Sequence, residues 1–538
     1  MTGPHTQGTG GPAEAPAEPG APRARTPRPP VGLPLLGPYL WVFAGLAVCV
    51  ALLSLRLVTS GDPFAHLAVG RWIAEHRAVP RQDLFLYTSA HHPWVAHHWL
   101  FQLALYGVYR VAGMAGVQVM VLLAALAVVA ILLHLWRRMG VHPALAPLPF
   151  LLALVLMAER FRARPELATS VLLAATLSLL FQWRARPGRA IWALPAIGAL
   201  WANLHGGMVS GLLLCGVFTA CEGLRVLAAG RLGPALPPAR WASLALATAA
   251  MAAAPLLNPY GLRWYEAVTP GRIGFLRDYI VEWQPLIGPD GHVAASLPVL
   301  LGLLALALAS FIAARRFDPT ALVVAVVFAA LALQAQRNLA LLGPALLAVM
   351  AANLGGTEWL GRRRWAVPAC AAAGGLVGLA VIALALNMAP FSRMARMRRL
   401  GLGVDAAVVP VAATEWVRWN RLPGRLFNEY RYGGYLAWAS RGGRPAFIDG
   451  LNAYEADLFK QYVEIRRAKP QAKALLDRWE VNTCLLPHPQ VTPPRPVGDL
   501  RLLLADSPQE WALAYQDATA VVFVRLNPVG DADRPALQ

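Results

Sequence analysis

Charged residues are scarce in this sequence. Only 14% of its 538 residues are charged and 57% are hydrophobic, whereas soluble domains carry about 25% charged residues. The deficit argues against an ordinary soluble protein and predicts a chain that crosses a membrane many times. Lysine is nearly absent, because Lys460, Lys469 and Lys473 are the only lysines among 48 basic residues. Arginine therefore supplies almost all of the formal charge of +19.

Cysteine pairs and nucleotide-binding motifs are also missing. The five cysteines have no metal-ligand spacing, and four of them, Cys49, Cys215, Cys221 and Cys370, lie in apolar segments. Cys484 stands alone in the polar C-terminal part and cannot form an internal disulfide there. The chain has no glycine-rich phosphate loop and no nucleophile elbow.

Long hydrophobic segments are what the sequence has in abundance. A membrane-spanning helix needs roughly 20 apolar residues. We predict about eleven such helices, near residues 36–57, 113–136, 142–158, 167–183, 190–204, 207–228, 240–257, 294–314, 319–335, 338–354 and 366–388. Residues 100–111 either extend the second helix or lie on the membrane surface, and periodicity does not decide between these.

Arginine-rich loops alternate with polar segments, and this alternation predicts the topology. The basic inner loops would be Arg137–Arg138, Arg184–Arg189, Arg225–Arg240, Arg315–Arg316 and Arg362–Arg364. Short basic loops are typical of the cytoplasmic side of a membrane, so this arginine sets topology and we expect no nucleic-acid partner. We predict a multi-pass protein of the inner (cell) membrane with a cytoplasmic N-terminus and a periplasmic or extracellular C-terminus.

Composition divides the chain into three parts. Residues 1–33 are rich in proline, glycine and alanine, which predicts a disordered cytoplasmic tail. Residues 34–390 form the membrane domain, whose first apolar segment lacks a small-residue cleavage site and is expected to be retained. Residues 391–538 form an extracytoplasmic α/β domain. Its expected strands lie at 425–430, 444–450, 481–487, 511–517 and 520–525, and its expected helices at 433–440, 455–468 and 471–480.

The first outer loop, residues 58–100 and called simply the first loop, carries the densest chemistry. It contains Asp62, Asp83 and six histidines. Asp62 precedes Pro63 and is a helix N-cap, a general base or a cation ligand, and capping excludes neither other role. His66 follows one helical turn later, so that both side chains could address one substrate group. Asp83 is either a turn or cap residue or a second acid.

Four of the six histidines form two adjacent pairs, His91–His92 and His97–His98. The two pairs point in different directions, which makes a poor zinc site. Trp94 and Trp99 lie among them, and amphipathic rings favour the boundary between membrane and water. We therefore interpret these histidines as residues of that boundary.

Several outer polar residues lie at predicted helix ends. Arg160, Arg162 and Arg164 alternate before Glu166. They suit bidentate binding of an anion such as phosphate, or else salt bridges to the acids around them. Arg337 lies in a very short outer hairpin, where a half-buried guanidinium needs a partner.

Two tight outer turns carry further polar residues. Asn203 and His205 lie in one turn, and Asn258 and Tyr260 lie in the other. Each pair is either simple turn chemistry or part of a substrate site. Glu282 completes the ring of outer polar residues.

Three sets of motifs carry a resemblance to a known family. They are Asp62…His66-Leu67…Gly70…Ile73…Pro80…Asp83…Trp94…Trp99-Leu100 in the first loop, Trp201-Ala202-Asn203-Leu204-His205-Gly206-Gly207, and in the tail Phe427-Asn428…Gly433-Gly434-Tyr435-Leu436 with Phe447-Ile448-Asp449-Gly450. In these segments the chain resembles a group of bacterial polytopic proteins that are placed with the GT-C glycosyltransferases. That group lies near the mannosyl and aminoarabinosyl transferases that use polyprenyl-phosphate sugars.

The resemblance implies a GT-C-like polytopic fold and a transferase activity. Such an enzyme takes a sugar from a polyprenyl-phosphate donor and passes it to a glycan, lipid or protein acceptor on the outer face. The resemblance implies that Asp62 is a catalytic base or a metal partner, with Asp83 and His66 assisting. A divalent cation, Mg²⁺ or Mn²⁺, is the cofactor that this role allows. The outer arginines would hold the donor phosphate.

Two other functions stay open on the sequence. A transporter or flippase for a lipid-linked glycan would place polar residues along the middles of its helices, whereas polarity here collects at the outer ends. A non-catalytic envelope-assembly protein would use the C-terminal domain to bind a partner.

Overall fold

The computed structural model describes most of the chain from residue 36 onward, within the compact unit Leu33–Gln538. The described residues are 36–229, 231, 234–269, 279–288, 293–314, 317–356, 366–386, 399–422, 424–441, 443–493 and 498–530. The predicted tail over 1–33, the predicted boundary at 390–391 and the loops at Arg315–Arg316 and Arg362–Arg364 lie outside them.

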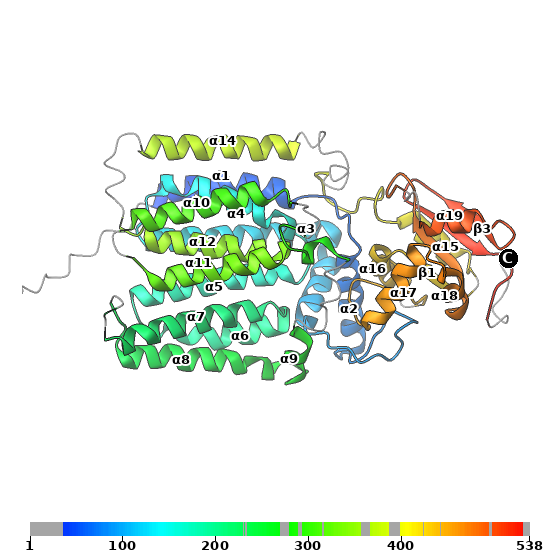
Figure 1. Cartoon of the computed structure of the whole chain (residues 1–538), viewed down its shortest axis with the longest axis horizontal. Helices are drawn as coiled ribbons and strands as arrows, with labels where there is room; N and C mark the ends of the chain where they lie inside the picture. The colour runs from blue at the N-terminus through cyan, green and yellow to red at the C-terminus, as the bar shows by residue number, and fades with distance from the viewer. Residues whose placement is uncertain are drawn as a thin grey trace, which may run out of the picture. The chain divides into compact units, whose positions relative to one another are not determined.

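Helices run side by side through the first two thirds of the chain (Figure 1). Each of the eleven expected apolar segments contains one: α1 (Leu36–Ser54), α3 (Trp99–Arg138), α4 (Pro147–Met157), α5 (Glu166–Ala185), α6 (Ala193–Leu204), α7 (Met208–Leu227), α8 (Pro238–Ala253), α10 (Leu297–Ala313), α11 (Pro319–Gln334), α12 (Leu339–Asn353) and α14 (Ala366–Leu386). Two shorter helices, α2 (Asp62–His76) and α9 (Arg263–Val268), lie between them in sequence.

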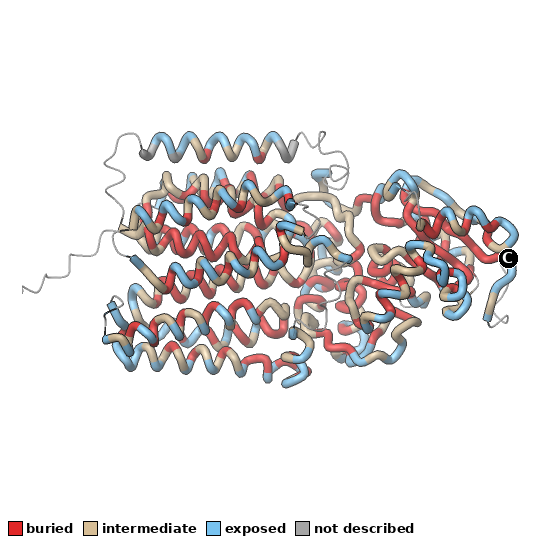
Figure 2. Tube along the Cα trace, viewed as in Figure 1, coloured by how far each residue is buried: buried red, intermediate tan, exposed pale blue. Residues whose placement is uncertain are grey.

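Length and composition qualify six of these helices, within the described residues, to cross a membrane. They are α1, α3, α5, α7 and the continuous helical segments Pro143–Arg160 and Pro238–Leu257. The polytopic helical architecture is therefore confirmed, while the number of eleven spans stays a prediction. α12 is buried along nearly its whole length, whereas α8 and α14 expose much of their surface (Figure 2).

A glycine divides the long helix α3. Gly113 has φ 59° and ψ −156°, a conformation that side chains with a Cβ rarely adopt, and it breaks the helix there. The segment before Gly113 packs on α2, where a Cβ on Gly70 would clash with the carbonyl oxygen of Gln102 and lie 2.8 Å from the Tyr106 side chain. Residues 100–111 therefore continue α3 in sequence but form a separate arm that lies against the first loop.

The C-terminal domain is a small sheet covered by helices. The strand order is β1 (Arg425–Asn428), β2 (Val481–Pro487), β4 (Ala520–Arg525) and β3 (Trp511–Gln516). The pair β1–β2 is parallel, and the pairs β2–β4 and β3–β4 are antiparallel. The helices are α15 (Val411–Trp419), α16 (Gly433–Ala439), α17 (Ala456–Arg466), α18 (Ala472–Arg478) and α19 (Leu500–Ala505).

Four of the five expected strands are confirmed, and the strand expected at 444–450 is wrong. Ala446 instead forms an isolated bridge to the first loop: its N–H donates to Phe85 O at 2.8 Å, and Tyr87 N–H donates to Ala446 O at 3.2 Å. Thr88 Oγ1 donates to Phe447 O at 2.5 Å. The first loop and the Asn428 side chain, which bonds Phe447 N–H and Ile448 O, therefore satisfy the backbone of this segment, and no strand of the sheet pairs with it.

The C-terminal domain is fastened to the N-terminal end of α2 through α16. A Cβ on Gly434 would clash with Gly61 O, and a Cβ on Gly61 would clash with Arg431 O. The rings of Phe64 and Tyr435 meet edge to face, 4.8 Å apart. Because glycines allow this close approach of backbones, the start of α2 is wedged between the two domains.

An ion cluster joins three helices at the ends that were predicted to face the cytoplasm. Glu222 Oε1 lies 3.2 Å from Arg225 Nη1 and 3.4 Å from Arg184 Nη1, and it accepts a hydrogen bond from Thr320 Oγ1 at 2.9 Å. Asp318 pairs with both arginines. These two arginines therefore link α5, α7 and α11 in addition to any effect that they have on topology.

Candidate active site

Asp62 is the first residue of α2 and does not cap it. The N-cap is Gly61, and no side chain makes the cap hydrogen bond. Ser60 Oγ accepts from Asp62 N–H at 3.2 Å and donates to Asp62 Oδ2 at 2.7 Å. The N-cap alternative is therefore wrong, because the Asp62 carboxylate accepts no hydrogen bond from the first turn of the helix and instead contacts other side chains.

The partner of Asp62 is Arg164, which lies in the loop before α5. Their side chains are in direct ion-pair contact. Arg164 Nη1 also lies 3.5 Å from Glu282 Oε2, and Arg160 Nη1 lies 3.1 Å from the same oxygen. Burial lowers the pKa of Arg164, but the carboxylates of Asp62 and its acidic neighbours outweigh burial and raise this pKa. Arg164 therefore stays cationic.

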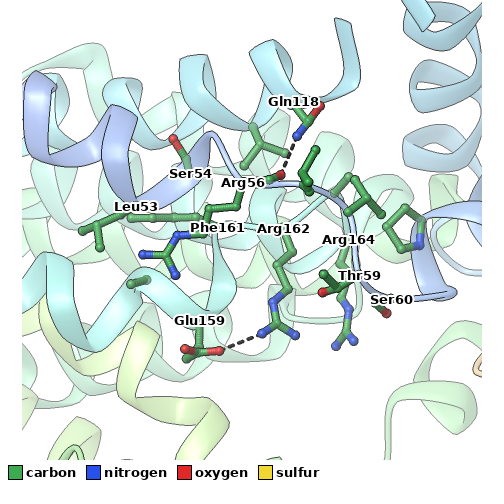
Figure 3. A pocket seen from close by; sticks show the side chains of 16 residues that line it. Leu53, Ser54, Arg56, Thr59, Ser60, Gln118, Glu159, Phe161, Arg162 and Arg164 are labelled. Carbon is green, nitrogen blue, oxygen red and sulfur yellow. Dashed lines mark hydrogen bonds and ion pairs between the residues drawn. The ribbon is translucent and has the colours of Figure 1, made fainter. Parts of the chain in front are cut away.

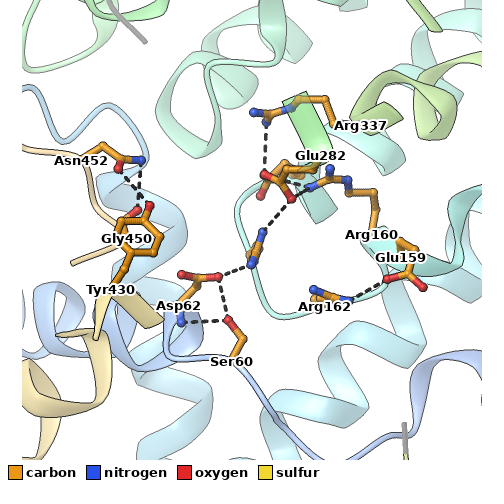
Figure 4. Close-up of polar contacts among 12 residues, drawn as sticks. Ser60, Asp62, Glu159, Arg160, Arg162, Glu282, Arg337, Tyr430, Gly450 and Asn452 are labelled. Carbon is orange, nitrogen blue, oxygen red and sulfur yellow. Dashed lines mark hydrogen bonds and ion pairs between the residues drawn. The ribbon is translucent and has the colours of Figure 1, made fainter. Parts of the chain in front are cut away.

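Glu166 and Arg337 extend this network. Arg337 Nη2 lies 3.3 Å and Arg160 Nη1 lies 3.8 Å from Glu166 Oε1. The Arg337 guanidinium also stacks over the Trp283 ring, 4.0 Å from its centroid. Figure 4 shows the chain of contacts, in which Asp62 meets Arg164 and Arg164 leads through the glutamates to Arg160 and Arg337.

Each of the four arginines singled out in the sequence has an acidic partner. Arg162 Nη2 lies 2.7 Å from Glu159 Oε2, and both side chains are about half exposed. Of the two alternatives, the structure therefore shows salt bridges between these arginines and the surrounding acids. An anion would enter this network by exchanging with a glutamate, since the arginines keep their charge when a carboxylate leaves.

A pocket with an empty volume of about 670 Å³, part of it open to solvent, adjoins the network. It lies between the end of α1, the first loop, α3 and the loop before α5 (Figure 3). Arg56, Arg162 and Arg164 reach it, and its apolar lining includes Leu53 and Phe161. Cationic groups beside apolar walls suit a ligand with an anionic head and a hydrocarbon tail.

His66 and His205 lie behind the network with fixed orientations. Gln102 Nε2 donates to His66 Nδ1 at 3.1 Å. Thr169 Oγ1 and Gly207 N–H donate to His205 Nδ1 at 2.7 Å and 3.0 Å. Burial lowers the pKa of His66 to about 4 and that of His205 to about 3. Both rings are therefore neutral near pH 7 and carry their proton on Nε2.

His97 and His98 belong to the same inner group. The His98 ring centroid lies 3.9 Å from that of His97, 5.6 Å from that of His66 and 6.1 Å from that of His205. Burial lowers the pKa of both added histidines. The turn that starts α3 places them beside His66 of α2, whereas His91 is exposed, and their assignment to the membrane boundary stays a prediction.

Three other predicted site residues make structural hydrogen bonds. Asn203 Oδ1 accepts from Trp99 Nε1 at 2.8 Å. Asn258 Oδ1 accepts from Tyr260 N–H at 3.1 Å, and its Nδ2 donates to Ala202 O at 3.0 Å. The turn-chemistry alternative describes these residues, and they hold the helix ends that surround the histidines.

Asp83 lies in a buried turn outside the ion network. Its Oδ1 accepts from Phe85 N–H at 2.9 Å and from Leu86 N–H at 3.4 Å, and the Ser89 hydroxyl donates to Oδ2. Burial raises the pKa of Asp83 to about 6, against the effect of these hydrogen bonds. Its contacts are those of a turn residue.

The C-terminal domain supplies a wall of the site that was not predicted from the sequence. A Cβ on Gly450 would lie 2.5 Å from Asp62 Oδ1. Tyr430 OH donates to Asn452 Oδ1 at 3.0 Å, and Asn452 Nδ2 donates to Gly450 O at 3.3 Å. Figure 4 shows these residues on the side of Asp62 away from the arginines. The Phe447–Gly450 motif was the available signal for this wall.

The described residues do not fit the divalent cation that the family resemblance allows. Among them, no group of three or more histidine, cysteine, aspartate or glutamate side chains is placed to hold a metal ion. Asp62 is held by an arginine, and Asp83 is held by N–H and hydroxyl donors. These two acids therefore do not form the metal site that the resemblance would require of them.

Neither a protein-family model nor a curated protein matches this sequence. Solved structures do match. ArnT from Cupriavidus metallidurans, bound to undecaprenyl phosphate, has a TM-score of 0.55 at 13% identity, over 92% of this chain and 100% of that one. The oligosaccharyltransferase AglB from Archaeoglobus fulgidus, in complex with an inhibitory peptide and a dolichol-phosphate, has a TM-score of 0.55 at 14% identity, over 92% and 75%.

A third similar structure is the arabinofuranosyltransferase AftD from Mycobacteria. Its TM-score is 0.52 at 15% identity, and the match covers 92% of this chain and 40% of AftD. All three are GT-C glycosyltransferases. The likeness extends over nearly the whole described chain and confirms the GT-C-like fold.

Proposed function

We propose that this chain, which has the fold of the GT-C membrane glycosyltransferases, transfers a sugar from a polyprenyl-phosphate donor to an acceptor on the extracytoplasmic face. The observation that carries the proposal is the position of Asp62. Its carboxylate is held by Arg164 at the rim of a pocket that combines arginines with apolar walls. Two similar structures contain lipid phosphates, undecaprenyl phosphate in ArnT and a dolichol-phosphate in AglB, which supports the same class of donor here.

The pocket would bind the two parts of the donor, the lipid chain and the phosphate, with apolar and cationic side chains respectively. The lipid chain would lie along apolar residues such as Leu53 and Phe161, and the phosphate would contact Arg162 and Arg164. A guanidinium binds phosphate through two parallel N–H···O bonds. The same arginines would stabilise the negative charge that the phosphate gains when it leaves.

Asp62 would act as the general base. Its carboxylate takes the proton of an acceptor hydroxyl, and the acceptor oxygen attacks the anomeric carbon of the donor sugar. The bond from that carbon to the phosphate oxygen breaks, and its electron pair leaves with the lipid phosphate. Attack on the face opposite the phosphate inverts the anomeric configuration. Arg164 and Ser60 orient the carboxylate.

The test replaces Asp62 by asparagine in cells that lack the native gene. We expect Asp62→Asn to lower transfer by about 100-fold to 10,000-fold. Mass spectrometry should then show unused polyprenyl-phosphate sugar accumulating and one envelope glycan disappearing. The control is Asp457→Asn, an exposed acid on α17 whose loss should change neither pool. Restoration of the glycan by Asp62→Asn at normal membrane abundance would refute the assignment.

A further inference from the structure

A second buried carboxyl lies beside Asp62. Asp449 belongs to the C-terminal domain, precedes Gly450 and is 1% exposed. Its Oδ1 accepts a hydrogen bond from Leu451 N–H at 2.9 Å, and its Oδ2 has no hydrogen-bond partner among the described residues. Asp449 is therefore a buried acid with one of its two carboxyl oxygens unsatisfied.

Acids and phenols face Asp449 from every side. Asp83 faces it from the first loop, Asp62 from the start of α2, and Tyr430 and Tyr454 from its own domain. No arginine, lysine or histidine of the described residues is among the groups that shift its pKa. Burying a carboxylate without a cation is strongly unfavourable, and a carboxyl in that setting takes up a proton instead.

The segment that Asp449 begins packs on Asp62. Gly450 approaches Asp62 Oδ1 so closely that a methyl group would not fit, and Asn452, at φ 55°, folds back to the carbonyl of Gly450. A negative charge on Asp449 would repel the Asp62 carboxylate across this contact. A neutral Asp449 removes this repulsion and therefore favours the contact.

We propose that Asp449 is a positioning residue of the site, which stays protonated at neutral pH and thereby lets residues 449–452 pack against Asp62. The inference rests on the proposed role of Asp62 as the base. The two acids would thus work in opposite protonation states: Asp62 has to be ionised to act as a base, whereas Asp449 has to stay protonated.

The pH dependence of stability follows from this arrangement. Burial, and next the neighbouring Asp83, raise the pKa of Asp449 to about 8. The folded chain thus keeps a proton that the unfolded chain releases at the ordinary Asp pKa of 3.8. The stability that this proton contributes is fully present at a pH below that ordinary pKa, and it is lost as the pH rises to about 8.

The test compares Asp449→Asn with the native chain, both full-length and purified in lipid nanodiscs. The apparent melting temperature is measured between about pH 5 and about pH 9, a range that spans this titration. Because asparagine is a neutral mimic, Asp449→Asn should flatten the pH profile, so that its melting temperature relative to the native chain is higher at the alkaline end than at the acidic end by about 2 °C or more. The control is Asp457→Asn, which removes an exposed acid of α17 that lies outside this group and should keep the native pH profile.

A second variant keeps the test decisive if Asp449→Asn fails to fold. Asp83→Asn removes a carboxyl that raises the pKa of Asp449, so this pKa should fall toward its ordinary value. Because the raised pKa of Asp83 is itself about 6, the comparison is made above that pH, where the remaining loss of stability should be smaller and should be complete at a lower pH than in the native chain. Identical pH profiles for the native chain and whichever of the two variants folds would overturn the proposal. This readout needs no transfer activity, so its failure is distinguishable from failure of the proposed function.

Transfer itself supplies the last readout. Asp449→Asn should keep most of the transfer at neutral pH and extend it to higher pH, whereas Asp449→Ala should lower transfer at every pH by loosening the 449–452 segment. Loss of transfer in Asp449→Asn without loss of folding would show that the charged form is needed, contrary to the proposal.

Discussion

At the scale of single residues, the candidate site depends on an ion pair between two distant segments, Asp62 and Arg164. An acid directly after the first apolar segment and before a proline is visible in the sequence. Arg164 lies 102 residues further on, and three alternating arginines gave no means of choosing which one meets Asp62. Ion pairs between distant segments depend on packing, which local patterns do not encode.

Arg162 offers the sharpest residue-scale test of the phosphate pocket. Its side chain lines the pocket, and its partner Glu159 is about half exposed, so breaking their pair should cost about 1 kcal/mol or less. Losing a charged hydrogen bond to phosphate costs more. We expect Arg162→Ala to weaken undecaprenyl phosphate binding about 10-fold in nanodiscs without lowering the melting temperature.

The matched control for that prediction is Arg467→Ala, an exposed arginine that follows α17. It removes the same charge from the C-terminal domain and should leave binding unchanged. Equal affinity of the native chain and Arg162→Ala would exclude Arg162 from the phosphate site.

At the scale of elements, apolar runs located the helices well, because a helix in lipid needs little beyond length and hydrophobicity. The break in α3 was missed, since nothing local distinguishes Gly113 from the glycines that continue a helix. The segment 444–450 was assigned wrongly because its backbone bridges to the first loop at Ala446 and does not pair with a neighbouring strand, although Phe447 packs on Phe427 of β1. Tertiary contacts decided both cases.

The ion cluster between α5, α7 and α11 yields the element-scale prediction. Glu222 is almost fully buried and contacts two arginines and the Thr320 hydroxyl. Removing its charge leaves those arginines with Asp318 alone. We expect Glu222→Gln to destabilise the chain by about 3–5 kcal/mol, seen as a lower melting temperature in detergent.

Glu266→Gln is the control for this cluster, because Glu266 is an exposed acid on α9. The Glu266→Gln variant should have the same melting temperature as the native chain. If Glu222→Gln also had the melting temperature of the native chain, the ion cluster would not stabilise the fold, and apolar packing alone would hold the three helices together.

At the scale of the whole molecule, the candidate site is shared between the two domains. The sequence separated the membrane helices from the α/β domain, but it gave no indication that Gly61, Gly434 and Gly450 meet around Asp62. Glycines mark close approaches only after the approaching partner is known. The Phe447–Gly450 motif therefore drew attention to this segment, but its position against Asp62 could not be predicted from the sequence.

The whole-molecule prediction concerns this junction. A Cβ on Gly434 would clash with Gly61 O and lie 3.0 Å from the Ala65 side chain. We expect Gly434→Ala to loosen the domain contact, so that the amides of Tyr87 and Ala446 exchange about 10-fold faster with solvent deuterium. Gly107→Ala, with nothing within 4 Å of its added Cβ, should leave that exchange unchanged. Unaltered protection in Gly434→Ala would mean that the first loop alone holds the domains together.

The junction around Gly61 also fixes an order in time. During synthesis, the residues near Gly61 leave the ribosome long before Arg431 and Gly450, which complete the surroundings of Asp62. At about 5–20 residues per second, that delay is on the order of tens of seconds. A nascent chain thus carries its acid and its arginines in the membrane without the wall that closes on them. The surroundings of Asp62 are therefore complete only after Gly450 has emerged from the ribosome and packed against it.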